Sequence, residues 1–192
     1  MIVEGLLTST NRAGEVNVAP MGPIVHGDFE SLTLRPFSGS TTFQNLLESR
    51  AGVFHVVDDV SVIAETAIRR LDRLPETVPA TRVQGAVLKN CCRWFEFEIS
   101  SVDTSNERSE MSATIVHSGE SKPFDGFNRA KHAVIEAAIL ATRVHILPVD
   151  DIMSHLKILT SAVKKTGSPR EIASFEMLVE HIQNQARKAQ PT

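Results

Sequence analysis

The residues whose types and spacing could do chemistry gather between positions 35 and 42. There the chain places the guanidinium of Arg35 ahead of a hydroxyl-rich turn, Ser40-Thr41-Thr42, that opens a predicted helix. The N–H groups at a helix start favour an anion, and an arginine adds charge-assisted, bidentate hydrogen bonds. This set suits a phosphate monoester. An ordinary helix cap beside a surface arginine would use the same residues, and the spacing alone leaves both interpretations open.

A second candidate segment runs from Asn17 to Pro23 and reads Asn-Val-Ala-Pro-Met-Gly-Pro. Ala19 and Gly22 carry little or no side chain, and the prolines leave backbone groups without partners in a sheet. The segment could therefore let a flat aromatic ring approach, with backbone amides facing the polar edge of the ring. A bulged edge strand is the alternative interpretation.

Other reactive side chains have simpler explanations. Cys91 and Cys92 are adjacent, so we expect two reduced structural thiols instead of a disulfide or a metal site. The pair Asp58-Asp59 is more typical of a strand-ending turn than of an acid/base pair. The histidines of the C-terminal half are spaced too irregularly for a metal cluster, and we predict no metal site.

The elements that must position these residues follow from hydrophobic periodicity and turn signals. Strands are predicted over residues 1–10, 16–25, 30–37, 51–57, 87–100 and 111–117, and helices over residues 41–50, 61–71, 128–146, 148–165 and 169–189. Strands that precede a run of helices are typical of an α+β protein, and short antiparallel strands with glycine turns favour a barrel. We predict an N-terminal antiparallel β-barrel domain over residues 1–122 and a C-terminal three-helix region, packed on the barrel, over residues 123–192.

The bulk composition argues against several classes of function. The 192 residues carry a net charge of −3 and 42% hydrophobic residues, and the basic residues are scattered along the chain. That charge gives no electrostatic reason to expect nucleic acid or an anionic membrane as a partner. No apolar run approaches the length of a membrane span, and the opening residues, with Glu4 among them, do not read as a signal peptide. We expect a cytoplasmic protein.

Two motifs taken together resemble the FMN-binding split-barrel superfamily, which includes flavin reductase-like and pyridoxamine-phosphate-oxidase-like proteins. They are Asn-x-Ala-Pro-Met-Gly at residues 17–22 and Arg-Pro-Phe-x-Gly-Ser-x-Thr-Phe-x-Asn-Leu at residues 35–46. More closely, the chain is similar to a branch found in archaea and in bacteria that use methanopterin-linked one-carbon pathways. That likeness is carried by the runs Val56-Val57-Asp58-Asp59, Asn128-Arg129-Ala130 and Lys165-Thr166-Gly167.

The resemblance implies a homodimer of split β-barrels with FMN held at the subunit interface. The residues that it assigns to the ribityl phosphate are Arg35, Ser40, Thr41, Thr42 and Asn45. Those that it places along the isoalloxazine ring are Ala19, Pro20, Met21 and Gly22. His55 departs from the family pattern, in which asparagine is more common at this position. The helix from Asn128 presents Arg129, Glu136 and Arg143 on one face, which is either solvated or closed over the flavin.

Three hypotheses of function follow. The leading one is an FMN-binding flavoprotein, an oxidoreductase or flavin reductase-like protein of cofactor or one-carbon metabolism, for which no catalytic residue is assigned. The second is a non-catalytic dimeric split-barrel module for binding or assembly. The third, a pterin-related reductase, is suggested only by the association of the family.

Overall fold

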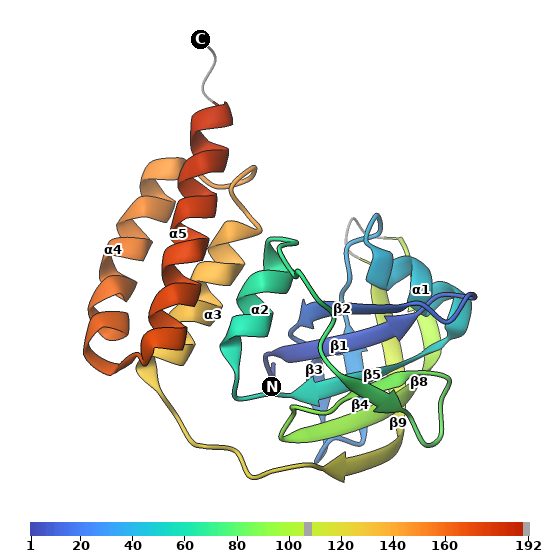
Figure 1. Ribbon diagram of the computed structural model, residues 1–192. Coiled ribbons are helices and arrows are strands. Elements are labelled where there is room, and N and C mark those ends of the chain that lie inside the picture. Colours follow the sequence, from blue (N-terminus) through green and yellow to red (C-terminus); the bar gives the residue numbers. More distant parts are fainter. Residues whose placement is uncertain (106–108, 190–192) are drawn as a thin grey trace. The chain divides into compact units, whose positions relative to one another are not determined.

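The computed structural model describes residues 1–105 and 109–189. The chain forms two compact units. The first consists of residues 1–57 and 73–124, and the second of residues 58–72 and the chain from residue 125 onward. Figure 1 shows the strands in the first unit and a group of helices in the second.

The first unit is built on a curled antiparallel sheet. Its strands are β1 (Gly5–Thr10), β2 (Val16–Met21), β3 (Ile24–His26), β4 (Ser31–Leu34), β5 (Ala51–Val56), β8 (Arg93–Asp103) and β9 (Glu110–Glu120). They lie side by side in the order β2-β1-β5-β8-β9-β4-β3 (Figure 1). A bridge between Ile2 and Ile24 brings the start of the chain to β3, so the two margins of the sheet approach each other. The prediction of an α+β protein with an antiparallel barrel is confirmed.

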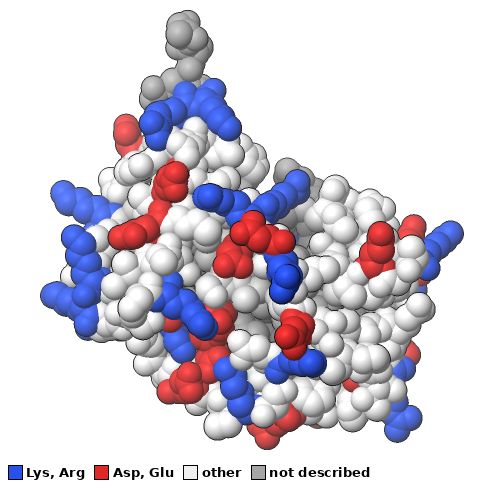
Figure 2. Space-filling model, viewed as in Figure 1, with Lys and Arg blue, Asp and Glu red and all other residues white. Residues whose placement is uncertain are grey.

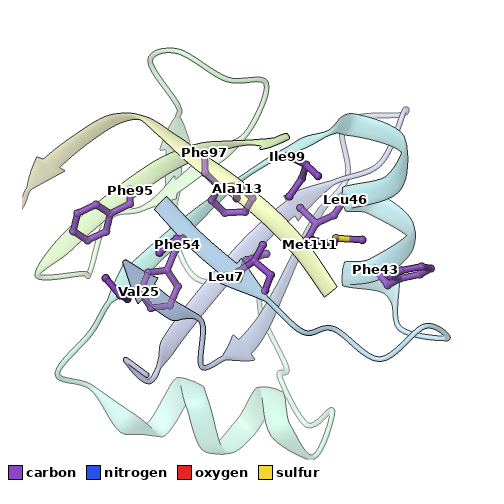
Figure 3. Packing of buried hydrophobic residues seen from close by; sticks show 12 residues of the cluster. Leu7, Val25, Phe43, Leu46, Phe54, Phe95, Phe97, Ile99, Met111 and Ala113 are labelled. Atoms are coloured by element: carbon purple, nitrogen blue, oxygen red, sulfur yellow. The ribbon is translucent and has the colours of Figure 1, made fainter. Parts of the chain in front are cut away.

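The core of this unit lies inside the curl of the sheet. On β8, Phe95, Phe97 and Ile99 are buried at alternate positions, as the period of two in the sequence predicted. Figure 3 shows these side chains gathered with residues of β1, β3, β5, β9 and the helix α1 (Thr41–Ser49). Close packing of the aromatic and branched side chains in this cluster stabilises the curled sheet, and the sheet in turn positions the loops that connect its strands.

Two predicted strands are wrong as single elements. Residues 16–25 divide into β2 and β3, which stand at opposite ends of the strand order. The apolar run over residues 87–100 divides into β7 (Ala86–Leu88), which pairs with β6 (Thr77–Pro79), and β8, which begins at Arg93. The chain turns between them, where the N–H of Cys92 donates to the carbonyl of Val56 at 2.8 Å. The hydrophobic pattern does not show that β7 and β8 pair with different strands, because both β7 and the start of β8 are rich in buried apolar residues.

The second unit is helical. It consists of α2 (Val60–Ala67), α3 (Arg129–Ala141), α4 (Val149–Thr166) and α5 (Pro169–Ala189). The alanines of α3 are buried where this helix packs against the other three. The Ser-x-x-Glu run before α5 forms a capping box, because Glu171 accepts hydrogen bonds from both the N–H and the hydroxyl of Ser168. Helix α3 ends five residues before the predicted residue 146, since residues 142–147 form turns.

Charges are distributed evenly over the visible surface. Figure 2 shows acidic and basic side chains interspersed on the viewed face of each unit. In the described part of the chain, no helix combines the length and apolar character that crossing a bilayer requires.

Candidate functional site

The turn between β4 and α1 presents an accessible helix start. Ser40 is the N-cap of α1, and its hydroxyl accepts the N–H of Phe43 at 3.1 Å. The N–H groups of Thr41 and Thr42 have no acceptor within the helix, as at any helix start. The first turn of α1 contains no acidic residue, and the space around Gly39 is open. The exposed side chain of Thr41 adds a hydroxyl, so the turn offers hydrogen-bond donors to an anion.

Arg35 stands directly after β4, before this turn. Its guanidinium contacts one carboxylate oxygen of Glu110, with Nη2 at 3.1 Å and Nε at 3.2 Å. Both side chains are about half exposed, and ion pairs of this kind contribute only about 0–1 kcal/mol. Arg35 can therefore exchange Glu110 for another anion at small cost. In the same region, the hydroxyls of Ser38 and Ser109 lie 3.0 Å apart.

Two predicted phosphate ligands already have partners inside the unit. The buried hydroxyl of Thr42 accepts a hydrogen bond from the side-chain amide of Asn17 on β2, at 3.0 Å. The buried amide of Asn45 donates to the hydroxyl of Ser9 on β1, at 3.2 Å. These contacts attach α1 to the sheet. They also bring the two sequence motifs together, because Asn17 lies two residues before Ala19 on the same strand.

The outer margin of β2 has unpaired backbone groups. β2 is the last strand of the sheet on its side, and Pro20 stands opposite Leu6 of β1. Proline has no N–H, and the bonded positions alternate along an antiparallel pair. Pro20 and Val18 therefore direct their backbone groups away from β1. β2 is an edge strand, as the second interpretation of the sequence held, but it pairs with β1 in continuous register and not with a bulge. The edge presents the N–H of Val18 and the carbonyls of both residues.

Ala19, Met21 and Gly22 of this segment are half-buried. Met21 packs against the hydrophobic core, so its side chain points into the barrel. A Cβ at Gly22 would lie 2.7 Å from a carboxylate oxygen of Glu4. A side chain at this position would displace the exposed carboxylate of Glu4, a contact that the sequence pattern does not show.

His55 lies under β1 and is fully buried. One ring nitrogen, Nδ1, is 3.2 Å from the carbonyl of Leu6, and the other, Nε2, is 3.1 Å from the N–H of Leu88. The neutral ring matches both partners, because it has one donor and one acceptor. Burial lowers the pKa of His55 to about 4, although the bond to Leu6 acts in the opposite direction. The ring therefore has a structural role next to β1, the strand with which β2 pairs.

The remaining candidates also have structural roles. Asp59 caps α2 through a hydrogen bond from the N–H of Ser61 and pairs with Arg170 at 2.7 Å. Cys91 and Cys92 are buried free thiols, as predicted. Within residues 1–105 and 109–189, no group of three or more His, Cys, Asp or Glu residues could hold a metal ion.

Some residues of the site were missed by sequence reasoning. Asn17 was seen as part of a strand, but its bond to Thr42 was not predicted. Glu110, the first residue of β9, and Ser109 directly before it approach the turn from more than 70 residues further along the chain. No local pattern could reveal these contacts, because they depend on β4 pairing with β9.

Most of the chain matches the models of one protein family. Residues 3–122 match the N-terminal domain of a family described as a protein of unknown function, DUF447, and residues 128–180 match the C-terminal part of the same family. The chain belongs to the DUF447 family. No curated protein matches this DUF447 chain.

Solved structures share the fold of this DUF447 protein. An FMN-bound protein of Methanosarcina mazei, from the same family, is 24% identical and superposes with a TM-score of 0.80 over 94% of both chains. The flavin reductase of the styrene monooxygenase from Pseudomonas putida is 14% identical, with a TM-score of 0.55 over 63% of this chain and 82% of its own. An FMN-binding protein of Thermus thermophilus is 13% identical, with a TM-score of 0.53 over 62% and 70%. The first unit thus shares the split-barrel fold of these structures.

Proposed function

We propose that this protein binds FMN and acts as a flavin reductase-like oxidoreductase. The observation that carries the proposal is the bond between Asn17 and Thr42, which joins an anion-binding helix start to the free edge of β2. This hydrogen bond fixes the position of the proposed phosphate site relative to the proposed surface for a flat polar ring. The FMN described for the Methanosarcina mazei relative supports the same assignment.

The donors at the start of α1 fit a phosphate monoester. The exposed hydroxyl of Thr41, the cap residue Ser40 and the N–H groups of the first turn supply neutral donors, and Arg35 supplies the charge. A phosphate dianion would compete with Glu110 for the guanidinium. In this proposal Thr42 and Asn45 hold the helix in place from inside the unit.

The edge of β2 fits the ring. Isoalloxazine presents one N–H and two carbonyl oxygens along its pyrimidine side, and the N–H of Val18 with the carbonyls of Val18 and Pro20 can complement them. The backbone of Ala19, Met21 and Gly22 then borders the ring, because the side chain of Met21 points into the core. FMN, when bound, supplies the hydride and electron chemistry, while the protein binds and orients it.

Three finer statements belong to the proposal. We infer a homodimer that acts in the cytoplasm, and we infer a role in cofactor or one-carbon metabolism. The support for them is the sequence resemblance to split-barrel dimers and to the methanopterin-linked branch. Sedimentation velocity tests the dimer. Incubation of the FMN-loaded protein with NADH or NADPH and a dihydropterin, with flavin absorbance followed, tests the metabolic role.

The direct experiment compares FMN with riboflavin, which lacks the phosphate. Flavin fluorescence is followed as apoprotein is added, for the wild type and for Arg35→Ala. We expect saturable FMN binding and a loss of about tenfold or more for the variant, because a charge-assisted hydrogen bond is removed. Riboflavin affinity should not change. The matched control is Arg12→Ala, which removes an exposed arginine paired with Glu48 at 3.8 Å.

Three results test the role of Arg35, the phosphate site and FMN binding itself separately. Glu110→Gln should tighten FMN binding, because it removes the competing carboxylate from Arg35. Equal affinity for FMN and riboflavin would show that the turn is an ordinary helix cap. A purified protein that neither carries flavin nor binds it at about tens of micromolar would overturn the proposed function and leave a non-catalytic module.

A further inference from the structure

A cavity lies within the helical unit. It has a volume of about 480 Å³ and is lined by Ala141 at the end of α3, by Val144 and His145 of the following turns, and by residues of α5. Those residues are His181, Gln185 and Lys188, which recur at intervals of four and three and therefore share one face of the helix. Cavities of this size hold small organic molecules.

The polar wall of this cavity is basic. Lys188 and the two imidazoles of His145 and His181 face it, and Arg70, after α2, is close enough to act on His181 electrostatically. Burial lowers the pKa of His181, and the positive charges of Arg70 and Lys188 lower it further. Among the described residues, neither Arg70 nor Lys188 has a carboxylate within ion-pair distance.

Two other cations of the helical unit, by contrast, have carboxylate partners. Elsewhere in it, Arg170 pairs with Asp59 at 2.7 Å and Lys131 with Asp125 at 3.6 Å. A bound anion would pair with the ammonium group of Lys188, which lines the cavity, and would be attracted by the positive charge of Arg70 nearby. The opposite wall is apolar, because it is formed by the buried Ala141 and the half-buried Val144.

We propose that the cavity between α3 and α5 binds a small organic anion with an apolar body. Its carboxylate or phosphate group lies against Lys188 and His181, with Gln185 as a further hydrogen-bond donor. Its apolar body lies on Ala141 and Val144. The site is separate from the candidate FMN site, and the inference does not depend on the proposed function.

The test follows the histidine ring signals of the whole protein by proton NMR during titration. The probes are phenyl phosphate, benzoate and the neutral benzyl alcohol, and the signal of His181 is assigned by its absence in His181→Gln. We expect saturable movement of the His145 and His181 signals with one or both anions and none with the alcohol. Phenyl phosphate and benzoate distinguish a phosphate ligand from a carboxylate ligand.

Variants make the test specific to the cavity. Lys188→Ala should weaken anion binding about fivefold, as expected for one charge in a solvent-open site. The matched control is Arg187→Ala, since Arg187 lies on the same helix but donates to Asn184 at 2.8 Å instead of lining the cavity. Binding that falls equally in both variants, equal binding of benzyl alcohol, or no saturation by either anion would each overturn the proposal.

Discussion

The buried imidazole of His55 gives a stability change that can be worked out from the structure. The ring is held neutral between Leu6 and Leu88, and its pKa is lowered from the ordinary 6.5 to about 4. In the unfolded chain the ring takes up a proton below about pH 6.5, while in the folded chain it does not until about pH 4. This contribution to stability is therefore complete above the unfolded pKa and is lost as the pH falls toward 4.

The size of the loss follows from linkage. Each pH unit between the two pKa values costs about 1.4 kcal/mol, so we expect a loss of about 2–3 kcal/mol between pH 7.5 and pH 4.5. That is a large part of the stability of an ordinary domain. Protonation of His55 would also disturb the candidate site, because the ring bonds the carbonyl of Leu6 and Leu6 lies opposite Pro20 on β2.

The assay is urea unfolding at a series of pH values without added flavin, since a ligand would itself stabilise the folded state. Trp94 is the only tryptophan of the chain and lies in the barrel unit, so its fluorescence reports that unit. His55→Gln removes the titration, and the difference between the wild-type and variant curves isolates the imidazole. His26→Gln, at an exposed histidine of the same unit, is the control. A difference that stays constant from pH 7.5 to pH 4.5 would refute the reasoning.

Two further predictions concern the outer face of the same sheet. The buried carboxylate of Glu96 accepts the N–H groups of Thr81, Arg82 and Val83, at 2.8, 2.6 and 3.2 Å, and these bonds leave its pKa lowered although burial alone would raise it. Glu96→Gln should therefore cost about 1–3 kcal/mol in urea unfolding near neutral pH, and an unchanged midpoint would contradict this. Gly119→Ala should cost about 1–3 kcal/mol and shift the emission of Trp94, because the new Cβ would overlap the indole ring. A variant with wild-type emission and thermal stability would show that the ring moves aside freely.

The sequence determined the local elements wherever a signal is confined to neighbouring residues. Ser40 caps α1 as predicted, because a hydroxyl bonded to an N–H three residues ahead is a contact within one turn. The capping box of Ser168 and Glu171 was predictable for the same reason. Pro20 identified β2 as an edge strand, because a missing N–H excludes a central place in a sheet.

Only the tertiary structure decided which of these elements meet. It joined Thr42 to Asn17 across 25 positions and Arg35 to Glu110 across 75, and pairing at such distances leaves no local trace in a sequence. It also turned Thr42 and Asn45 inward, because they lie on the face of α1 that packs on the sheet, while Thr41 stayed exposed. The residue types therefore indicated an anion-binding turn and a ring-binding edge. Packing of α1 on β1 and β2 brings the turn and the edge strand together in the candidate site.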